Sequence, residues 1–92
     1  MTSLLLPTVQ PRIGRGFRLQ WEEAQHCHVL LYPEGMVKLN GSAGQIMTRC
    51  DGERSIDAIV AELEAAFNAS GLAPEVLSFV EIAGRQRWLV WE

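Results

Sequence analysis

The chain has 92 residues, of which 48% are hydrophobic and 21% charged, and its formal net charge is −3. This length predicts one domain with one core, and the composition excludes a disordered chain. The acidic balance argues against a nucleic-acid partner, because proteins that bind nucleic acid usually carry a basic surface. The apolar run near the N-terminus is only Leu4–Leu6, so we expect neither a signal peptide nor a membrane span.

The two cysteines, Cys27 and Cys50, have no second cysteine at metal or redox spacing. They are predicted to be free, mostly buried thiols in a reducing compartment rather than a disulfide. Nothing in the sequence argues for export, so the expected location is the cytoplasm.

Residues 1–14 are predicted to form a flexible N-terminal arm. Pro7, Pro11 and Gly14 lie in this stretch, and proline removes a backbone donor and fixes φ, so we expect it outside regular elements. The arm is expected to stay mobile or to lie on a neighbouring chain. Residues 15–92 are then expected to form a single domain.

Three stretches are predicted to be strands. Apolar and polar residues alternate strictly over 17–22, which is typical of a half-buried strand. The residues 28–32 are rich in strand formers, and the residues 36–39 alternate again. A Pro-Glu-Gly sequence at 33–35 favours a turn, so the second and third strands are predicted to form a hairpin.

Helical periodicity begins after the third strand. A first helix is predicted over 43–50, with Ser42 and Gln45 forming a capping box in which each side chain satisfies a free backbone N–H. Ser55 is predicted to cap a second helix, whose apolar stripe continues over 56–67.

A third helix is predicted to begin at Pro74, because proline suits the first helical position, and to end at Gly84. The tail contains Trp88 and Trp91, which are expected to pack on the sheet or on another chain rather than stay in water. Strands followed by helices indicate an α+β fold, with a three-stranded antiparallel sheet and then three helices.

His26, Cys27 and His28 are the residues that most suggest metal binding. On a regular strand the two histidines would share one face and the cysteine the other, so the three could not converge on one ion. Neither this cysteine nor Cys50 has a base and an orienting partner indicated by the sequence. We therefore expect no metal, no cofactor and no catalytic residue.

The third predicted strand, 36–39, is expected to lie at an edge of the sheet beside an apolar helix. An edge strand has unpaired N–H and C=O groups that an extended peptide can bind. By the same reasoning, proline at Val37 is expected to weaken peptide binding by removing an edge donor. The alternative is that the chain's own tail or arm covers this edge, and the residues alone do not decide between the two.

A long ordered series of residues resembles one known family, pyrroloquinoline quinone (PQQ) biosynthesis protein D. The resemblance covers about 17–88, outside the arm, and rests on three main stretches, Arg18–Gln25, Leu30–Asn40 and Cys50–Gly52. It implies a winged helix-turn-helix-like fold and a non-catalytic peptide chaperone. Such a chaperone would bind the ribosomally made PQQ precursor by strand addition and present it to a radical S-adenosylmethionine enzyme.

The resemblance also implies a groove between the third strand and the third helix. The implied peptide-binding residues are Met36, Val37, Lys38, Leu39, Val76, Leu77, Val80 and Ala83. The implied partners are the PQQ precursor and the radical enzyme, with no nucleic acid and no membrane. The protein is expected to be a monomer or a dimer, and a hinge at Gly14 or Gly16 would permit strand exchange between copies.

The alternative is a winged-helix DNA-binding regulator, which shares this architecture. The third helix argues against it, because it contains Glu75 and Glu81 and no Lys or Arg before Arg85.

Overall fold

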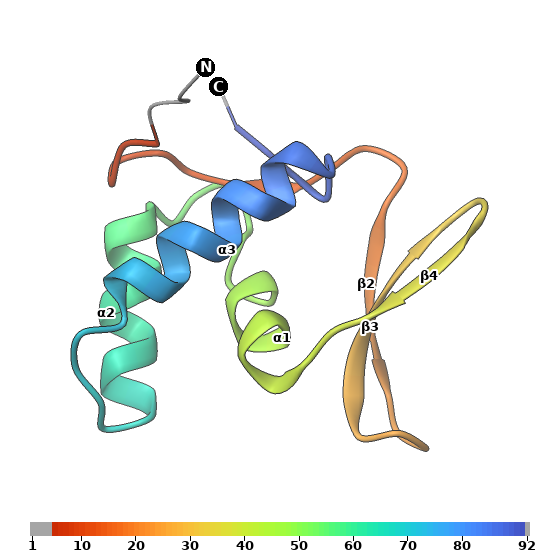
Figure 1. The fold of residues 1–92 in the computed structure, drawn as a ribbon, viewed down its shortest axis with the longest axis horizontal. Helices are drawn as coiled ribbons and strands as arrows, with labels where there is room; N and C mark the ends of the chain where they lie inside the picture. Colours follow the sequence, from red (N-terminus) through yellow and green to blue (C-terminus); the bar gives the residue numbers. More distant parts are fainter. Residues whose placement is uncertain (1–4, 92) are drawn as a thin grey trace.

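Three main strands are followed by three helices, and two short strands flank this sequence of elements (Figure 1). The computed structural model describes residues 5–91, so residues 1–4 of the predicted arm and Glu92 lie outside the described residues. In chain order the elements are β1 (Arg12–Ile13), β2 (Arg18–Glu22), β3 (Cys27–Tyr32), β4 (Gly35–Lys38), α1 (Gly41–Met47), α2 (Ile56–Ala66), α3 (Ala73–Arg85) and β5 (Leu89–Val90).

The strands β2, β3 and β4 form an antiparallel sheet in that order, which confirms the predicted α+β fold. Leu30, in the middle of β3, is opposite Leu19 of β2 and Val37 of β4, so these three side chains share one face of the sheet. Leu30 is fully buried, and the other two are half-buried against the same core. This face is therefore the one that packs against the helices.

The helix α1 begins earlier than the predicted 43–50, because its N-cap is Asn40. The side-chain oxygen of Asn40 accepts a hydrogen bond from the N–H of Ala43 at 2.7 Å. The predicted capping box of Ser42 and Gln45 is therefore wrong. Asn40, two residues after the end of β4, accepts from the helix N-terminus in the place predicted for the serine.

The other two helices begin close to where the sequence indicates. Ser55 is confirmed as the N-cap of α2, since its hydroxyl accepts a hydrogen bond from the N–H of Ala58 at 3.1 Å. Pro74 lies in the first turn of α3. The predicted end at Gly84 is wrong, because α3 continues past it. This glycine instead allows close packing, since a Cβ here would overlap the ring of Trp91.

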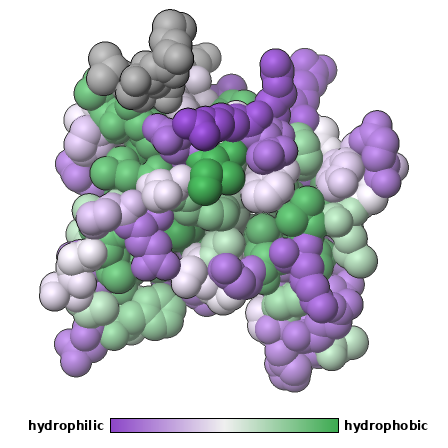
Figure 2. Space-filling model, in the orientation of Figure 1, coloured by the Kyte–Doolittle hydropathy of each residue, from purple (hydrophilic) through white to green (hydrophobic). Residues whose placement is uncertain are grey.

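One hydrophobic core joins the sheet to the three helices. On the side of the molecule shown in Figure 2, apolar residues gather toward the middle and hydrophilic residues lie around them. None of the described helices is long and apolar enough to cross a membrane. The buried core residues are Leu30, Leu39, Ala43, Ile46, Met47, Cys50, Ile56, Ile59, Leu63, Val76, Val80, Ala83 and Leu89.

Residues 5–13 lie against the chain's own helices and tail. The carbonyl groups of Pro7 and Val9 accept hydrogen bonds at 3.0 and 2.9 Å from backbone N–H groups in the first turn of α2. Further along, β1 pairs with β5 near the other end of the chain. The expectation that this stretch contains no regular element is wrong for β1, because its partner comes from a distant segment. The division of the chain at residue 14 into arm and domain stays a prediction.

The link between β1 and β2 lies directly on the tail. The N–H of Gly14 donates to the carbonyl oxygen of Trp88 at 2.8 Å, and a Cβ on this glycine would overlap the carbonyl oxygen of Arg87. Trp88 and Trp91 are half-buried against the core of their own chain. The expectation that these tryptophans do not stay in water is thus confirmed, and the ring of Trp91 packs against Gly84 of α3 in the same chain.

Candidate functional site

The outer edge of β4 has free backbone groups. The N–H of Leu39 donates to the carbonyl of His28 at 3.0 Å, so these two residues form a hydrogen-bonded pair. Because hydrogen-bonded and non-bonded pairs alternate in an antiparallel ladder, Val37 also points its N–H and C=O toward β3. The N–H and C=O groups of Met36 and Lys38 point outward instead. Among residues 5–91, no strand pairs with this side of β4.

This register corrects one expectation about the site. The N–H of Val37 is directed at Leu30 of β3, so it is not an edge donor. The donors available to another chain are those of Met36 and Lys38. Sequence alternation identified the strand, but it contains no information about which alternate residues hydrogen-bond to the neighbour on each side.

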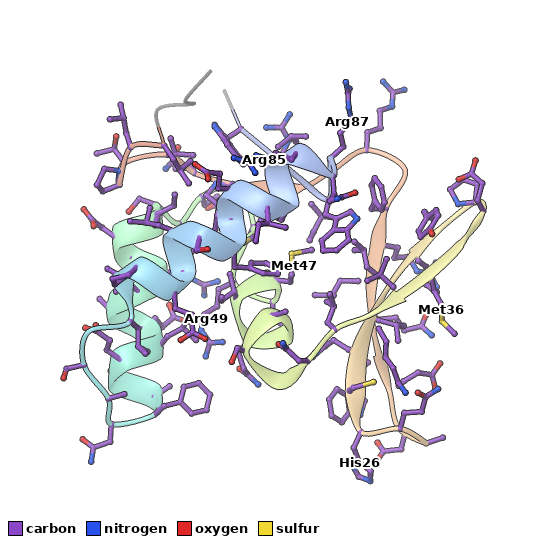
Figure 3. The ribbon with its side chains drawn as sticks, viewed as in Figure 1. His26, Met36, Met47, Arg49, Arg85 and Arg87 are labelled. Carbon is purple, nitrogen blue, oxygen red and sulfur yellow. The ribbon has the colours of Figure 1, made fainter. Side chains whose placement is uncertain are left out.

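The side chains of β4 divide between two environments. Met36, with 54% of its surface exposed, and Lys38 are both accessible to solvent. Figure 3 shows Met36 on the side of β4 away from the helices. Val37 is half-buried against the core, and Leu39, which directly follows β4, is buried. The strand therefore combines a buried anchor with an accessible edge.

The residues predicted on α3 are mostly core residues. Val76, Val80 and Ala83 have at most 2% of their surface exposed, and Leu77 is half-buried. Only Leu77 among these four has surface for direct contact. Val76, Val80 and Ala83 lie on the stripe of α3 that faces the core, so they anchor the helix by packing and are not accessible to a peptide.

The predicted site residues do not include those of the neighbouring stripe of α3. Phe79 is half-buried and Ile82 is 48% exposed, and they are three residues apart, so they lie on one face of the helix. The signal was present in the sequence, because the apolar stripe of α3 is wider than one core contact requires. An apolar side chain as exposed as Ile82 is a better contact residue than one of the buried valines.

The main packing partners of β4 and α3 differ. The strand packs on β3, whereas α3 packs on α2 and β5, and α1 packs on β3 and α2 (Figure 1). A cavity of about 350 Å³ lies between the three helices, and β4 does not line it. Its lining residues are Gly41, Ser42, Gln45, Ile46, Leu63, Phe67, Ala69, Leu72, Glu75 and Val76.

The cluster of histidines and a cysteine does not form a metal site. His26 has a φ of 51° in the turn before β3, so it does not share a strand face with His28 as expected. Nowhere in the described part of the chain do three His, Cys, Asp or Glu side chains lie close enough to hold a metal ion. His28 instead packs against the ring of Trp21, with the ring centres 5.0 Å apart.

Both cysteines are free thiols, as predicted. Cys50 is 3% exposed, and its S–H donates to the carbonyl oxygen of Ile46 at 3.2 Å. Burial raises the pKa of the Cys50 thiol to about 12, and the charge of Asp51 adds to this effect. The thiolate form is therefore very rare near neutral pH, and this cysteine serves as a small core residue.

A network of charged side chains joins α1 to α2. Arg49, just after α1, and Arg54 each pair with Glu62 of α2 at 3.1 Å. The carboxylate of Asp51 accepts hydrogen bonds from the backbone N–H groups of Arg54 and Glu53, and these bonds lower the pKa of Asp51. This network lies away from β4, so we assign it to the packing of the helices.

Comparison with known proteins identifies the family. Residues 27–89 match the family model of coenzyme PQQ synthesis protein D (PqqD). A PqqA binding protein of Azotobacter vinelandii is 58% identical over 80 residues, which cover 86% of this chain and 87% of the relative. A PqqA binding protein of Stutzerimonas stutzeri is 51% identical over 90 residues, covering 97% of each chain.

A solved structure has the same fold. It is the solution NMR structure of the PqqD truncation of Methylobacterium extorquens PqqCD, described as a functional, stand-alone recognition element for ribosomally synthesized and post-translationally modified peptides. It is 28% identical, with a TM-score of 0.74, and the match covers 89% of this chain and 88% of that chain. From the family match, the identities and this fold we conclude that the chain belongs to the PqqD family.

Proposed function

We propose that this chain binds the precursor peptide of PQQ and acts as a peptide chaperone without catalytic chemistry of its own. Membership of the PqqD family and relatives named PqqA binding proteins support the peptide-binding role. The observation that carries the proposed site is the unpaired edge of β4, with the backbone groups of Met36 and Lys38 directed outward.

Strand addition is the proposed binding mode. An extended peptide would pair with Met36 and Lys38 and become the fourth strand of the sheet. Side chains of the peptide opposite Val37 would lie on the helix-facing side of the sheet, where they would extend toward Phe79 and Ile82. Backbone pairing tolerates changes in the peptide sequence, while apolar contacts on the helix side would provide selection.

The peptide must also leave after it has been modified. A few edge hydrogen bonds are each worth only about 1 kcal/mol net, so strand addition without a deep pocket suits reversible binding. We propose that the chain presents the bound peptide to a radical S-adenosylmethionine enzyme, which would perform the chemistry. The cytoplasmic location remains a prediction. The DNA-binding alternative gains no support, because Glu75 and Glu81 are the charged residues of α3 before its last residue.

Titration of the isotopically labelled chain with a synthetic precursor peptide tests the site. We expect the amide signals of Met36 and Lys38 to shift and their hydrogen exchange to slow. The side-chain signals of Phe79 and Ile82 should shift as well. The amides of Leu19 and Trp21, at the opposite edge of the sheet, serve as the internal control, with the chain concentration held constant throughout the titration. Tight binding that shifts only the control edge, or only the residues around the helical cavity, would show that the proposed site is wrong.

The presentation step needs a separate experiment with the radical enzyme. The rate of peptide modification should rise when the wild-type chain is added, and should rise less with a chain whose β4 edge is blocked. Equal rates with and without the chain would contradict presentation while leaving peptide binding intact.

A further inference from the structure

The sheet has a second open edge, on the outer side of β2. Because β3 directs the backbone groups of Leu30 toward β4, it directs those of Val29 toward β2. Val29 is opposite Gln20, so Gln20 points its N–H and C=O inward. The N–H and C=O groups of Leu19 and Trp21, on either side of it, therefore point outward.

This edge contains no proline and is accessible to another strand. Within the described residues, β2 packs mainly on β3, and the stretch Arg18–Glu22 contains no proline. The ring of Trp21 is 47% exposed beside the unpaired backbone. Edge strands are usually protected by proline, a bulge or charged side chains. The two charges of this strand have opposite signs and lie at its two ends, so a second copy can pair with both.

The sequence of β2 is complementary to itself. If two copies pair antiparallel about a two-fold axis at Gln20, Arg18 of one copy is opposite Glu22 of the other, and the reverse pair forms as well. Leu19 is then opposite Trp21 of the second copy. The outward backbone groups of both copies meet in this register, because both belong to Leu19 and Trp21. Charge, apolar contact and hydrogen-bond direction therefore agree.

Neighbouring registers that keep the hydrogen-bond direction lose this match. Centring the axis on Leu19 places Arg18 opposite Gln20 of the second copy. Centring it on Trp21 places the two tryptophans opposite each other and leaves Arg18 beyond the strand. Only the register at Gln20 pairs the opposite charges.

We propose that β2 is a self-association surface, on which the partner is a second copy of this chain. The two sheets would join into one sheet of six strands, with the order β4-β3-β2-β2-β3-β4. Both β4 edges would stay at the outside, so the dimer could bind two peptides. The inference does not rest on the proposed function. A contact through one five-residue strand is small compared with the roughly 1,200–2,000 Å² of stable interfaces, so the dimer would be reversible.

Sedimentation of the full chain over a range of concentrations tests this surface. The wild-type chain should show concentration-dependent dimers, and Arg18→Glu or Glu22→Arg alone should weaken dimerisation roughly tenfold or more, because each places like charges opposite each other twice. An equimolar mixture of the two variants should restore dimers, since every charge then meets its opposite. Arg15→Glu and Glu53→Arg change the charge equally at exposed positions outside β2 and should leave dimerisation unchanged.

A measurement on the wild-type chain alone keeps the proposal testable if a variant does not fold. Hydrogen exchange at Leu19 and Trp21 should slow as the chain concentration rises, while exchange at Met36 and Lys38 stays constant. A wild-type chain that remains monomeric at its highest soluble concentration would overturn the proposal. So would a mixture of the two variants that dimerises no more strongly than either variant alone.

Discussion

Proline substitutions at two adjacent positions of β4 should affect different properties of the protein. In Met36→Pro the lost N–H points away from the sheet, so the pairing of β4 with β3 is retained. In Val37→Pro the lost N–H is the one directed at Leu30, a fully buried residue of β3. We therefore expect the first substitution to affect peptide binding and the second to affect the fold.

The expected magnitudes follow from which hydrogen bond is lost. Met36→Pro should change the free energy of unfolding by less than about 1 kcal/mol, because proline is tolerated where its nitrogen faces solvent. It should weaken peptide binding roughly tenfold, since it removes one edge hydrogen bond worth about 1 kcal/mol and its ring obstructs the incoming strand. Val37→Pro should cost about 1–3 kcal/mol of folding stability, because it removes a ladder hydrogen bond and leaves the buried carbonyl of Leu30 without its donor.

Two assays separate these outcomes. Urea unfolding followed by circular dichroism gives the stability of each variant, and calorimetric titration with the precursor peptide gives its affinity. Met36→Ala is the matched control, because it shortens the same side chain and retains the N–H. If Met36→Pro is folded and binds the peptide within twofold of Met36→Ala, strand addition at this edge is refuted.

Three further results should follow from contacts away from β4. Gly14→Ala should lower the free energy of unfolding by about 2–4 kcal/mol in urea melts, because its Cβ would overlap a backbone carbonyl and disturb a hydrogen bond. Gly41→Ala is the control and should lose no stability, because there is open space around its Cβ. In the native chain a thiol reagent should modify Cys27 faster than Cys50, whose pKa is about 12; equal rates would contradict the burial of Cys50. The pKa of Asp51 is lowered in the folded chain from its ordinary value of 3.8, so the ionised carboxylate should stabilise the fold above about pH 3.8. This contribution should be lost as the pH falls through the folded pKa. Asp51→Asn should reduce this part of the acid sensitivity in pH-dependent melts.

The candidate site could be predicted in part. Alternation and the turn before it predict a strand over 36–39, and this strand is expected to lie at an edge of the sheet. The structure leaves that edge unpaired within residues 5–91. The helix residues were less accurate, because the groove that the resemblance implies was placed on Val76 and Val80, which belong to the apolar stripe of the third helix. Such a stripe marks the buried side of a helix, whereas a binding residue must be apolar and also accessible, as Ile82 is.

The sequence by itself determined the order and type of the main elements. Alternation over 17–22, the Pro-Glu-Gly turn and the serine cap of α2 each depend on interactions within a few residues, so local patterns suffice to predict them. Only the tertiary structure decided the pairing of β1 with β5, the outward direction of the backbone groups of Met36, and the stripe of α3 that stays accessible. These features depend on partners far along the chain, and the hydrophobic periodicity of a short segment contains no information about where those partners lie.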